Sequence, residues 1–332
     1  TLLRRAAAPA APDGRGEKTE GRRTAALQHT LRHAVNLTGT GLHSGAAVAL
    51  TLRPAPAGHG IVFQRSDIPG PSGRIQARWD AVQSARLCTL IGNAAGATVS
   101  TVEHVMAALA GTGVHNVLVE IDGPEAPILD GSAAPIARAI LAAGRRAQGA
   151  PVRVLRICET VEVAEGEARA RLEPAEGMHI AFSIDFPVRA IGRQAFALDM
   201  ANGAFLRELS DCRTFALAAE IEALRAAGLA RGGSLANAVV FDGDRVLNPG
   251  GLRRKDEAVR HKMLDALGDL ALAGGPVLGR YTGHRAGHAV TNALLRALFA
   301  RPSAWAWTVL PAAAERLLPG AGVTPADIPT AA

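Results

Sequence analysis

The spacing of apolar and polar residues predicts strands that lead into helices, and this order occurs twice along the chain. Alternation at every second position is typical of a half-buried strand, whereas apolar residues three or four positions apart are typical of a helix. The first part of the chain is predicted to hold strands at 48–53, 61–65 and 114–121, a strand end running into a helix over 98–109, and a helix over 135–143. Gly144 then ends that last helix.

The pattern starts again after residues 148–151, a stretch with Gly and Pro that we predict to be a linker. Beyond it, strands are predicted at 152–157, 160–163, 179–184 and 238–241, and helices at 205–209, 216–227, 256–272 and 288–299. Strands followed by helices, twice, indicate an α+β fold class. The predicted division is a disordered N-terminal extension at 1–26, a first α+β domain at 27–150, a second at 151–312, and a C-terminal tail at 313–332.

Composition and charge narrow the class of protein. The chain has 332 residues, 48% apolar and 20% charged, which is typical of a globular protein large enough for two domains. Its net charge is +6, but residues 1–33 hold seven basic and three acidic side chains, or +4, so the remainder is nearly balanced. A nearly balanced folded region argues against nucleic-acid binding. The three cysteines are far apart and no apolar run is long enough to span a membrane, so we predict a cytoplasmic protein without disulfides.

The predicted helix at 256–272 carries the first candidate for chemistry. His261 and Asp265 are four residues apart and therefore lie on one face, one turn above the other. An imidazole and a carboxylate in this arrangement can bind the same metal ion. Taken alone, however, such a pair is more often a solvated ion pair on a helix surface.

A second candidate lies at the start of the helix predicted within 98–109. If Ser100 is the N-cap, Glu103 falls at the position that completes a capping box, which is a purely structural role. Alternatively, Glu103 precedes a metal-ligating His104 and acts as the base for a water molecule at the metal. The residues alone leave both interpretations open.

A third candidate is His288, which follows Gly287 at a predicted helix start. The helix dipole disfavours a protonated imidazole there, so a His288 that acts as an acid needs a nearby carboxylate, for which Asp269 is a candidate. A surface histidine without function is the alternative.

Six short motifs occur together in a fixed order. They are Gly41 to Gly45 (GLHSG), Ser100 to His104 (STVEH), Asp130 to Pro135 (DGSAAP), Arg213 to Phe215 (RTF), Val259 to Asp269 (VRHKMLDALGD) and Gly287 with His288. The series resembles the UDP-3-O-acyl-N-acetylglucosamine deacetylases, the zinc amidases of lipid A biosynthesis, over about residues 27–310. The motif around His261 is highly specific, and the glycine turns add order and spacing.

The resemblance implies two domains, each an α+β sandwich of a sheet against paired helices, with the active site between them. It also implies that His104, His261 and Asp265 bind zinc. Two imidazoles, one carboxylate and an open position are usual in a hydrolytic zinc site, and Fe²⁺ can replace zinc with these ligands.

The resemblance further implies the roles of five residues. Glu103 is the general base, and His288 protonates the leaving amine while Asp269 keeps it cationic. Thr214 donates to the developing oxyanion, and Lys262 adds positive charge near the site. An acid and a base of opposite starting charge predict a bell-shaped pH profile.

For the substrate, the resemblance implies an apolar passage for an acyl chain, built from an insert at about 216–239. The residues we expect to bind substrate are Phe215, Ala218, Ile221, Leu224, Leu235 and His43. The sequence departs from the better-known pattern twice. Phe215 is followed by residues 216–220 (ALAAE), where a Gly and an Asp are more usual, and Ser234 is followed by Leu and Ala instead of an aromatic residue. The preferred acyl length is therefore left open.

The expected partner is a UDP-sugar lipid substrate, with no nucleic acid, and we expect a monomer. An acylated substrate is compatible with peripheral contact with the inner membrane. One alternative is another zinc amidohydrolase, acting on a different acylated amine without a lipid passage. The other is a non-enzymatic basic module, which would show salt-dependent binding and which the balanced charge and the 4% aromatic content disfavour.

Overall fold

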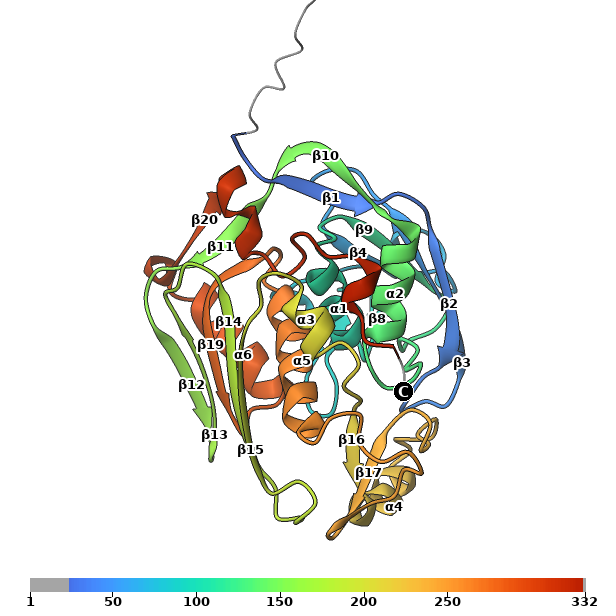
Figure 1. Ribbon diagram of the computed structural model, residues 1–332. Coiled ribbons are helices and arrows are strands. Elements are labelled where there is room, and N and C mark those ends of the chain that lie inside the picture. The colour runs from blue at the N-terminus through green and yellow to red at the C-terminus, as the bar shows by residue number, and fades with distance from the viewer. Residues whose placement is uncertain (1–23, 331–332) are drawn as a thin grey trace, which may run out of the picture.

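The computed structural model describes residues 24–330. It has the predicted α+β fold, with helices packed against mainly antiparallel sheets. Figure 1 shows α1 (Glu103–Thr112) and α5 (Glu257–Ala271) at the centre of the molecule, with a larger sheet on the left and a smaller one on the right. This arrangement brings elements from the first and second parts of the chain into direct contact.

The smaller sheet has five strands and is built from the first part of the chain. Its order is β2 (Val35–Thr40), β3 (Ala47–Pro54), β9 (Val117–Ile121), β4 (Ile61–Arg65) and β5 (Arg74–Gln76). The pairing is antiparallel except between β4 and β9. The same part holds α2 (Ala134–Ala143), ended by Gly144, and a small sheet of β6 (Val82–Ser84), β7 (Leu90–Gly92) and β8 (Thr98–Val99). The strands predicted at 48–53 and 61–65 and the helix at 135–143 are therefore confirmed.

The larger sheet has seven strands and is built from the second part of the chain. Its strands are β11 (Arg153–Ile157), β12 (Val161–Glu165), β13 (Ala168–Glu173), β14 (Met178–Asp185), β15 (Arg193–Asp199), β19 (Val277–His284) and β20 (Trp305–Val309). Burial alternates residue by residue along β14, as expected for a strand with one face on the core. The helices of this part are α3 (Ala204–Glu208), α5 and α6 (His288–Phe299). The predicted helices at 256–272 and 288–299 are confirmed, while the division into two domains stays a prediction.

The linker predicted at 148–151 is wrong. These residues belong to β10 (Arg145–Pro151), which pairs antiparallel with β1 (Leu27–Leu31) in a two-stranded ribbon. Gly and Pro are tolerated in such a strand because an exposed ribbon leaves some backbone groups unpaired. The partner strand lies more than a hundred residues away in sequence, so the local pattern contains no sign of the pairing.

The predicted insert forms a separate small unit. A three-stranded sheet of β16 (Phe215–Leu217), β17 (Val239–Asp242) and β18 (Arg245–Val246) carries α4 (Ala218–Ala226). Figure 1 shows this unit below the central helices. Part of the helix predicted over 216–227 is thus a strand.

The start of the described chain pairs with the segment near Leu310. Most of the extension predicted at 1–26 lies outside the described residues, but Ala26 is buried and its amide donates to the Leu310 carbonyl at 2.9 Å. The segment predicted as a C-terminal tail packs onto the fold, with Leu318 and Ile328 buried. Within residues 24–330, no helix combines the length and the apolar character that crossing a membrane requires.

The close approach of α1 and α5 depends on Gly268. A Cβ atom added at Gly268 would lie 2.1 Å from the carbonyl oxygen of Glu103, which is backbone and cannot rotate away. Helix backbones come this close only where a side chain is missing. Gly268 therefore fixes how Glu103 and His104 on α1 sit against α5.

We expect Gly268→Ala to lower the free energy of unfolding. Overpacking costs about 1–3 kcal/mol, and the gain of about 1 kcal/mol from replacing glycine within a helix offsets only part of it. Chemical denaturation would measure the change, with Gly250→Ala as the control because a Cβ there meets nothing within 4 Å. Equal stability of the two variants would contradict this account of the helix contact.

Candidate active site

Three potential metal ligands converge between α1 and α5. His104 lies in the first turn of α1, and His261 and Asp265 lie one turn apart on α5. All three are buried, and their ligand atoms lie within 4.8 Å of one another. Asp265 Oδ1 is 3.6 Å from His104 Nε2 and 3.3 Å from His261 Nε2. The cluster therefore joins the two parts of the chain.

The donor atoms of this cluster fit a metal ion. Asp265 Oδ1 is buried and has no hydrogen-bond partner within residues 24–330. His261 donates its Nδ1 proton to the Cys212 carbonyl at 3.0 Å. The lone pair of its Nε2 is therefore free and faces Asp265 Oδ1. Burial, with help from His104 and Lys262, lowers the pKa of His261 to about 4 against the opposing charge of Asp265, so the imidazole is neutral. Asp265 Oδ1 and His261 Nε2 are both electron-rich and lie close together, an arrangement that a cation between them stabilises.

Lys262 completes the electrostatics of the cluster. Its Nζ donates to Asp265 Oδ2 at 2.8 Å and leaves Oδ1 free. Burial acts to raise the pKa of Asp265, but His261 and Lys262 outweigh it and hold that pKa well below the usual range. Lys262 in turn has a raised pKa, because Asp265 outweighs the opposing effect of burial. Asp265 is therefore an anion at every physiological pH.

Glu103 lies beside the cluster and does not form the capping box, which was one of its two interpretations. The N-cap of α1 is Val102, Glu103 is the first helical residue, and the N-cap makes no side-chain bond. Ser100 lies two residues too early and donates instead to the Pro124 carbonyl at 3.2 Å. The Glu103 carboxylate is buried and accepts from the Thr89 amide at 3.0 Å. Burial raises its pKa, although nearby His288 opposes the shift.

His288 and Asp269 form a buried pair on the other side of Glu103. His288 donates from Nδ1 to Asp269 Oδ2 at 2.8 Å, and its Nε2 lies 3.7 Å from Glu103 Oε1. Burial acts to lower the pKa of His288, but Asp269, Glu103 and Asp265 together raise it to about 9. A carboxylate that can accept a proton thus faces an imidazolium that can donate one.

Two groups that orient this site have no signal in the sequence. Thr89 is fully buried; its amide binds Glu103, and its hydroxyl donates to Asp269 Oδ1 at 2.5 Å. It therefore connects the carboxylates that serve as candidate base and as partner of His288. The other group is the Cys212 carbonyl, which orients His261. A single threonine and a backbone carbonyl have no motif, so only tertiary structure places them here.

The residues between α3 and the insert line the same region. Thr214 follows two residues after Cys212, and its amide donates to the Gly131 carbonyl at 2.8 Å. The ring of Phe215 lies edge-on to the ring of His261, with the centroids 6.4 Å apart. Phe215 therefore connects the insert to the candidate metal cluster.

The remaining residues predicted to bind substrate lie around the insert. Ala218, Ile221 and Leu224 on α4 are partly buried, while Leu235 is 42% exposed. His43 lies in the turn after β2, where its amide donates to Glu125 Oε1 at 2.7 Å and its carbonyl accepts from the amide of Arg231 in the insert at 3.2 Å. The turn and the insert are thus joined through their backbones.

Comparison with known proteins finds one family over most of the chain. The family model described as UDP-3-O-acyl N-acetylglycosamine deacetylase matches residues 28–300. Proteins named UDP-3-O-acyl-N-acetylglucosamine deacetylase are similar over most of their length. The protein from Phenylobacterium zucineum is 56% identical over 279 residues, which cover 84% of this chain and 95% of that protein. Those from Myxococcus xanthus and Acidithiobacillus ferrooxidans are 49% identical over 296 residues (89% and 93%) and 50% identical over 280 residues (84% and 91%).

Proposed function

The chain belongs to the UDP-3-O-acyl-N-acetylglucosamine deacetylase family, and we propose that it hydrolyses the N-acetyl group of such a substrate with zinc bound at His104, His261 and Asp265. The products are acetate and UDP-3-O-acyl-glucosamine, in the committed step of lipid A biosynthesis. The observation that carries the proposal is the unpartnered Asp265 Oδ1 facing two imidazoles, with Glu103 alongside. Bound zinc would supply a Lewis acid for the amide carbonyl and for water, and Fe²⁺ can use the same ligands.

The protein's own groups then move the protons. Glu103 accepts a proton from the attacking water, and its burial suits it to this role because the raised pKa makes it a better base. His288 Nε2 donates a proton to the leaving amine, and Asp269 keeps the ring protonated and oriented. Thr214 donates to the oxygen on which negative charge develops. Lys262 keeps Asp265 ionised.

We expect kcat/KM to depend on pH in a bell-shaped manner. Glu103 must be ionised, and its pKa is raised, so activity falls as the pH drops toward that raised value. His288 must be protonated, and its pKa is about 9, so activity falls as the pH rises through about 9. Acetate release measured across the pH range would show both limbs, and the alkaline limb should be missing in His288→Ala. An alkaline limb that persists in this variant would contradict the assignment of the acid.

The acyl chain of the substrate is proposed to lie along the insert. Ala218 follows three residues after Phe215, at the start of α4, and Leu235 adds an exposed apolar side chain to the insert. The backbone bonds from Arg231 and Gly232 to the turn that holds His43 fix the position of this insert. The three cysteines are unpaired, which supports action in the reducing cytoplasm.

Shortening the 3-O-acyl chain is expected to lower kcat/KM about tenfold for every two methylene groups removed, since each buried methylene contributes about 0.8 kcal/mol. Acetate release from substrates of graded chain length would test this. Leu235→Asp should weaken the dependence, whereas Val309→Asp, at an apolar residue of similar exposure (51% against 42%) on β20 of the larger sheet, should not. Equal rates for all substrates, including one without an acyl chain, would favour the second candidate, a zinc amidohydrolase that acts on a different acylated amine.

A further inference from the structure

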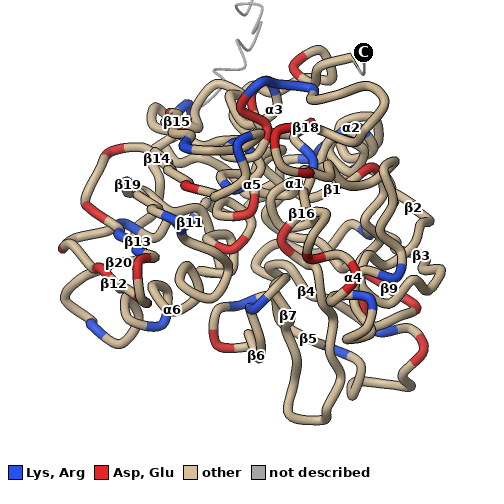
Figure 2. Tube along the Cα trace, turned by 90° about the horizontal axis from the view of Figure 1, so that it is seen from below, with Lys and Arg blue, Asp and Glu red and all other residues tan. Residues whose placement is uncertain are grey.

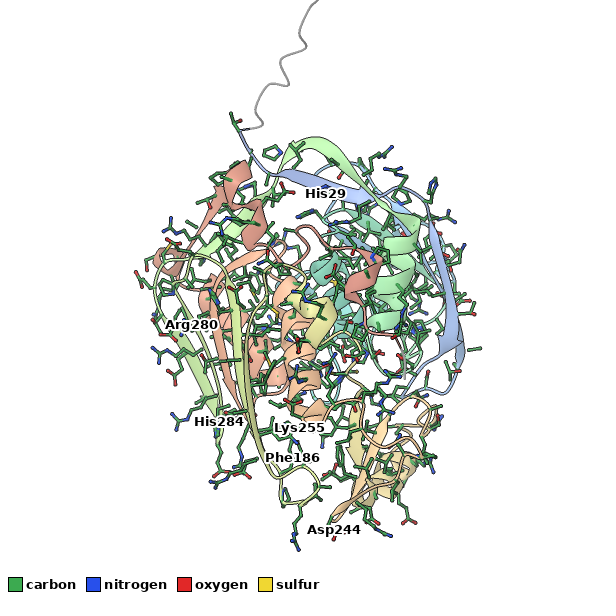
Figure 3. The ribbon with its side chains drawn as sticks, viewed as in Figure 1. His29, Phe186, Asp244, Lys255, Arg280 and His284 are labelled. Carbon is green, nitrogen blue, oxygen red and sulfur yellow. The ribbon has the colours of Figure 1, made fainter. Side chains whose placement is uncertain are left out.

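A cavity lies at the end of the two central helices that is remote from the candidate metal cluster. It has a volume of about 600 Å³, within the usual range for small-molecule sites. Its walls are the C-terminal turns of α1 and α5, β1 with His29, and the C-terminal segment at 315–322. No candidate ligand or catalytic residue lines it. In Figure 3, the label of Lys255, just before the start of α5, lies below the central helices. The label of His29 on β1 lies above them. We call this the rear cavity.

The wall of the rear cavity carries more basic than acidic side chains, although the charge of Glu315 acts on Arg145. Arg145 is partly buried, and its Nη1 donates to two carbonyls, Thr112 O at 2.7 Å and Gly320 O at 2.8 Å. Within residues 24–330 neither Arg145 nor Arg153 has a carboxylate within ion-pair distance of 4.0 Å. Glu315 is the single acidic residue of the wall among the described residues. Figure 2 shows bases and acids interspersed along the Cα trace.

Part of the wall is apolar. Trp307 lines the cavity with Arg153 over its ring at 5.6 Å, and Leu267, Leu270 and Val277 line it from α5 and β19. A wall with more cations than acids attracts an anion, and the apolar part of its surface favours an alkyl chain on that anion. We propose that the rear cavity binds an amphiphilic anion, in which a carboxylate or phosphate head group is carried on an alkyl chain.

The proposal can be tested with 12-bromododecanoate and the whole protein, because bromine quenches tryptophan fluorescence on contact. Trp307 reports the rear cavity, whereas Trp79 and Trp305 pack on Phe299 elsewhere. We expect saturable quenching that disappears in Trp307→Phe. Dodecyl phosphate should compete with the probe, which would identify phosphate as an accepted head group, and failure to compete would restrict the site to carboxylates.

Two variants and one control locate the binding. Arg153→Gln removes a cation whose side chain is exposed, and Ala271→Phe fills the cavity; each should weaken binding at least tenfold. Arg156→Gln, at an exposed arginine on the same strand but outside the cavity, should leave the affinity unchanged. If Ala271→Phe fails to fold, Arg153→Gln alone decides.

Three results would overturn the proposal. They are equal affinity for 12-bromododecanol, which lacks the charge, quenching that persists in Trp307→Phe, and unchanged affinity in Arg153→Gln. The second result would place the ligand beside Trp79 or Trp305. None of these measurements depends on deacetylase activity, so the proposed function and the rear cavity can fail separately.

Discussion

Glu103→Gln is expected to lower kcat by about 10²–10⁴-fold while the protein keeps its bound metal. The amide has the shape of the carboxylate and can still accept the bond from the Thr89 amide, but it cannot take a proton from water. The loss should therefore appear in kcat and only weakly in KM. Stopped acetate-release assays would measure kcat and KM, and the metal content would be measured on the same samples.

The control is Glu120→Gln, at a partly exposed glutamate on β9 that pairs with Arg53 on the surface. It makes the same chemical change and should leave kcat unaltered. A Glu103→Gln variant that retained near-full rate with zinc bound would remove Glu103 from the mechanism. A variant that lost both rate and metal would show that the carboxylate supports the metal cluster and would leave its role as a base without support.

The sequence predicted those elements whose signal is local. The helix at α5 was found because its apolar residues repeat with helical spacing over 256–272, and α1 because a similar run follows a strand end. The ribbon of β1 and β10 was missed, and its Gly-containing part was taken for a linker, because its stability comes from a partner far away in the chain. Strand pairing of this kind depends on tertiary context that no short window contains.

The same distinction applies to the site. His261 and Asp265 could be linked through their spacing on one helix, but His104 joined them only through the resemblance to a family. The capping box at Ser100 failed because the chain there bonds to Pro124, and the helix begins two residues later than the motif requires. Thr89 went unnoticed because its bonds to Glu103 and Asp269 exist only after the two parts of the chain have packed together.

His261→Ala is expected to abolish metal binding and, with it, acetate release. Removing the ring leaves His104 and Asp265 as two protein ligands, and Lys262 then competes for the Asp265 carboxylate without opposition from a metal. Loss of an outer-shell partner alone costs roughly 10–100-fold in metal affinity, so loss of a direct ligand should cost at least about 10²-fold. Zinc content after dialysis, measured with acetate release, would record both effects.

The matched control is His284→Ala, because His284 is an exposed histidine on β19 that contacts Ser183 and lies outside the cluster. It should bind zinc as the unaltered protein does. Added zinc should raise the melting temperature of the control but not of His261→Ala, because a ligand stabilises only the protein that binds it. If His261→Ala still held one zinc with unchanged affinity, the metal would have to sit elsewhere. The unpartnered Asp265 oxygen and the neutral imidazole beside it would then need another explanation.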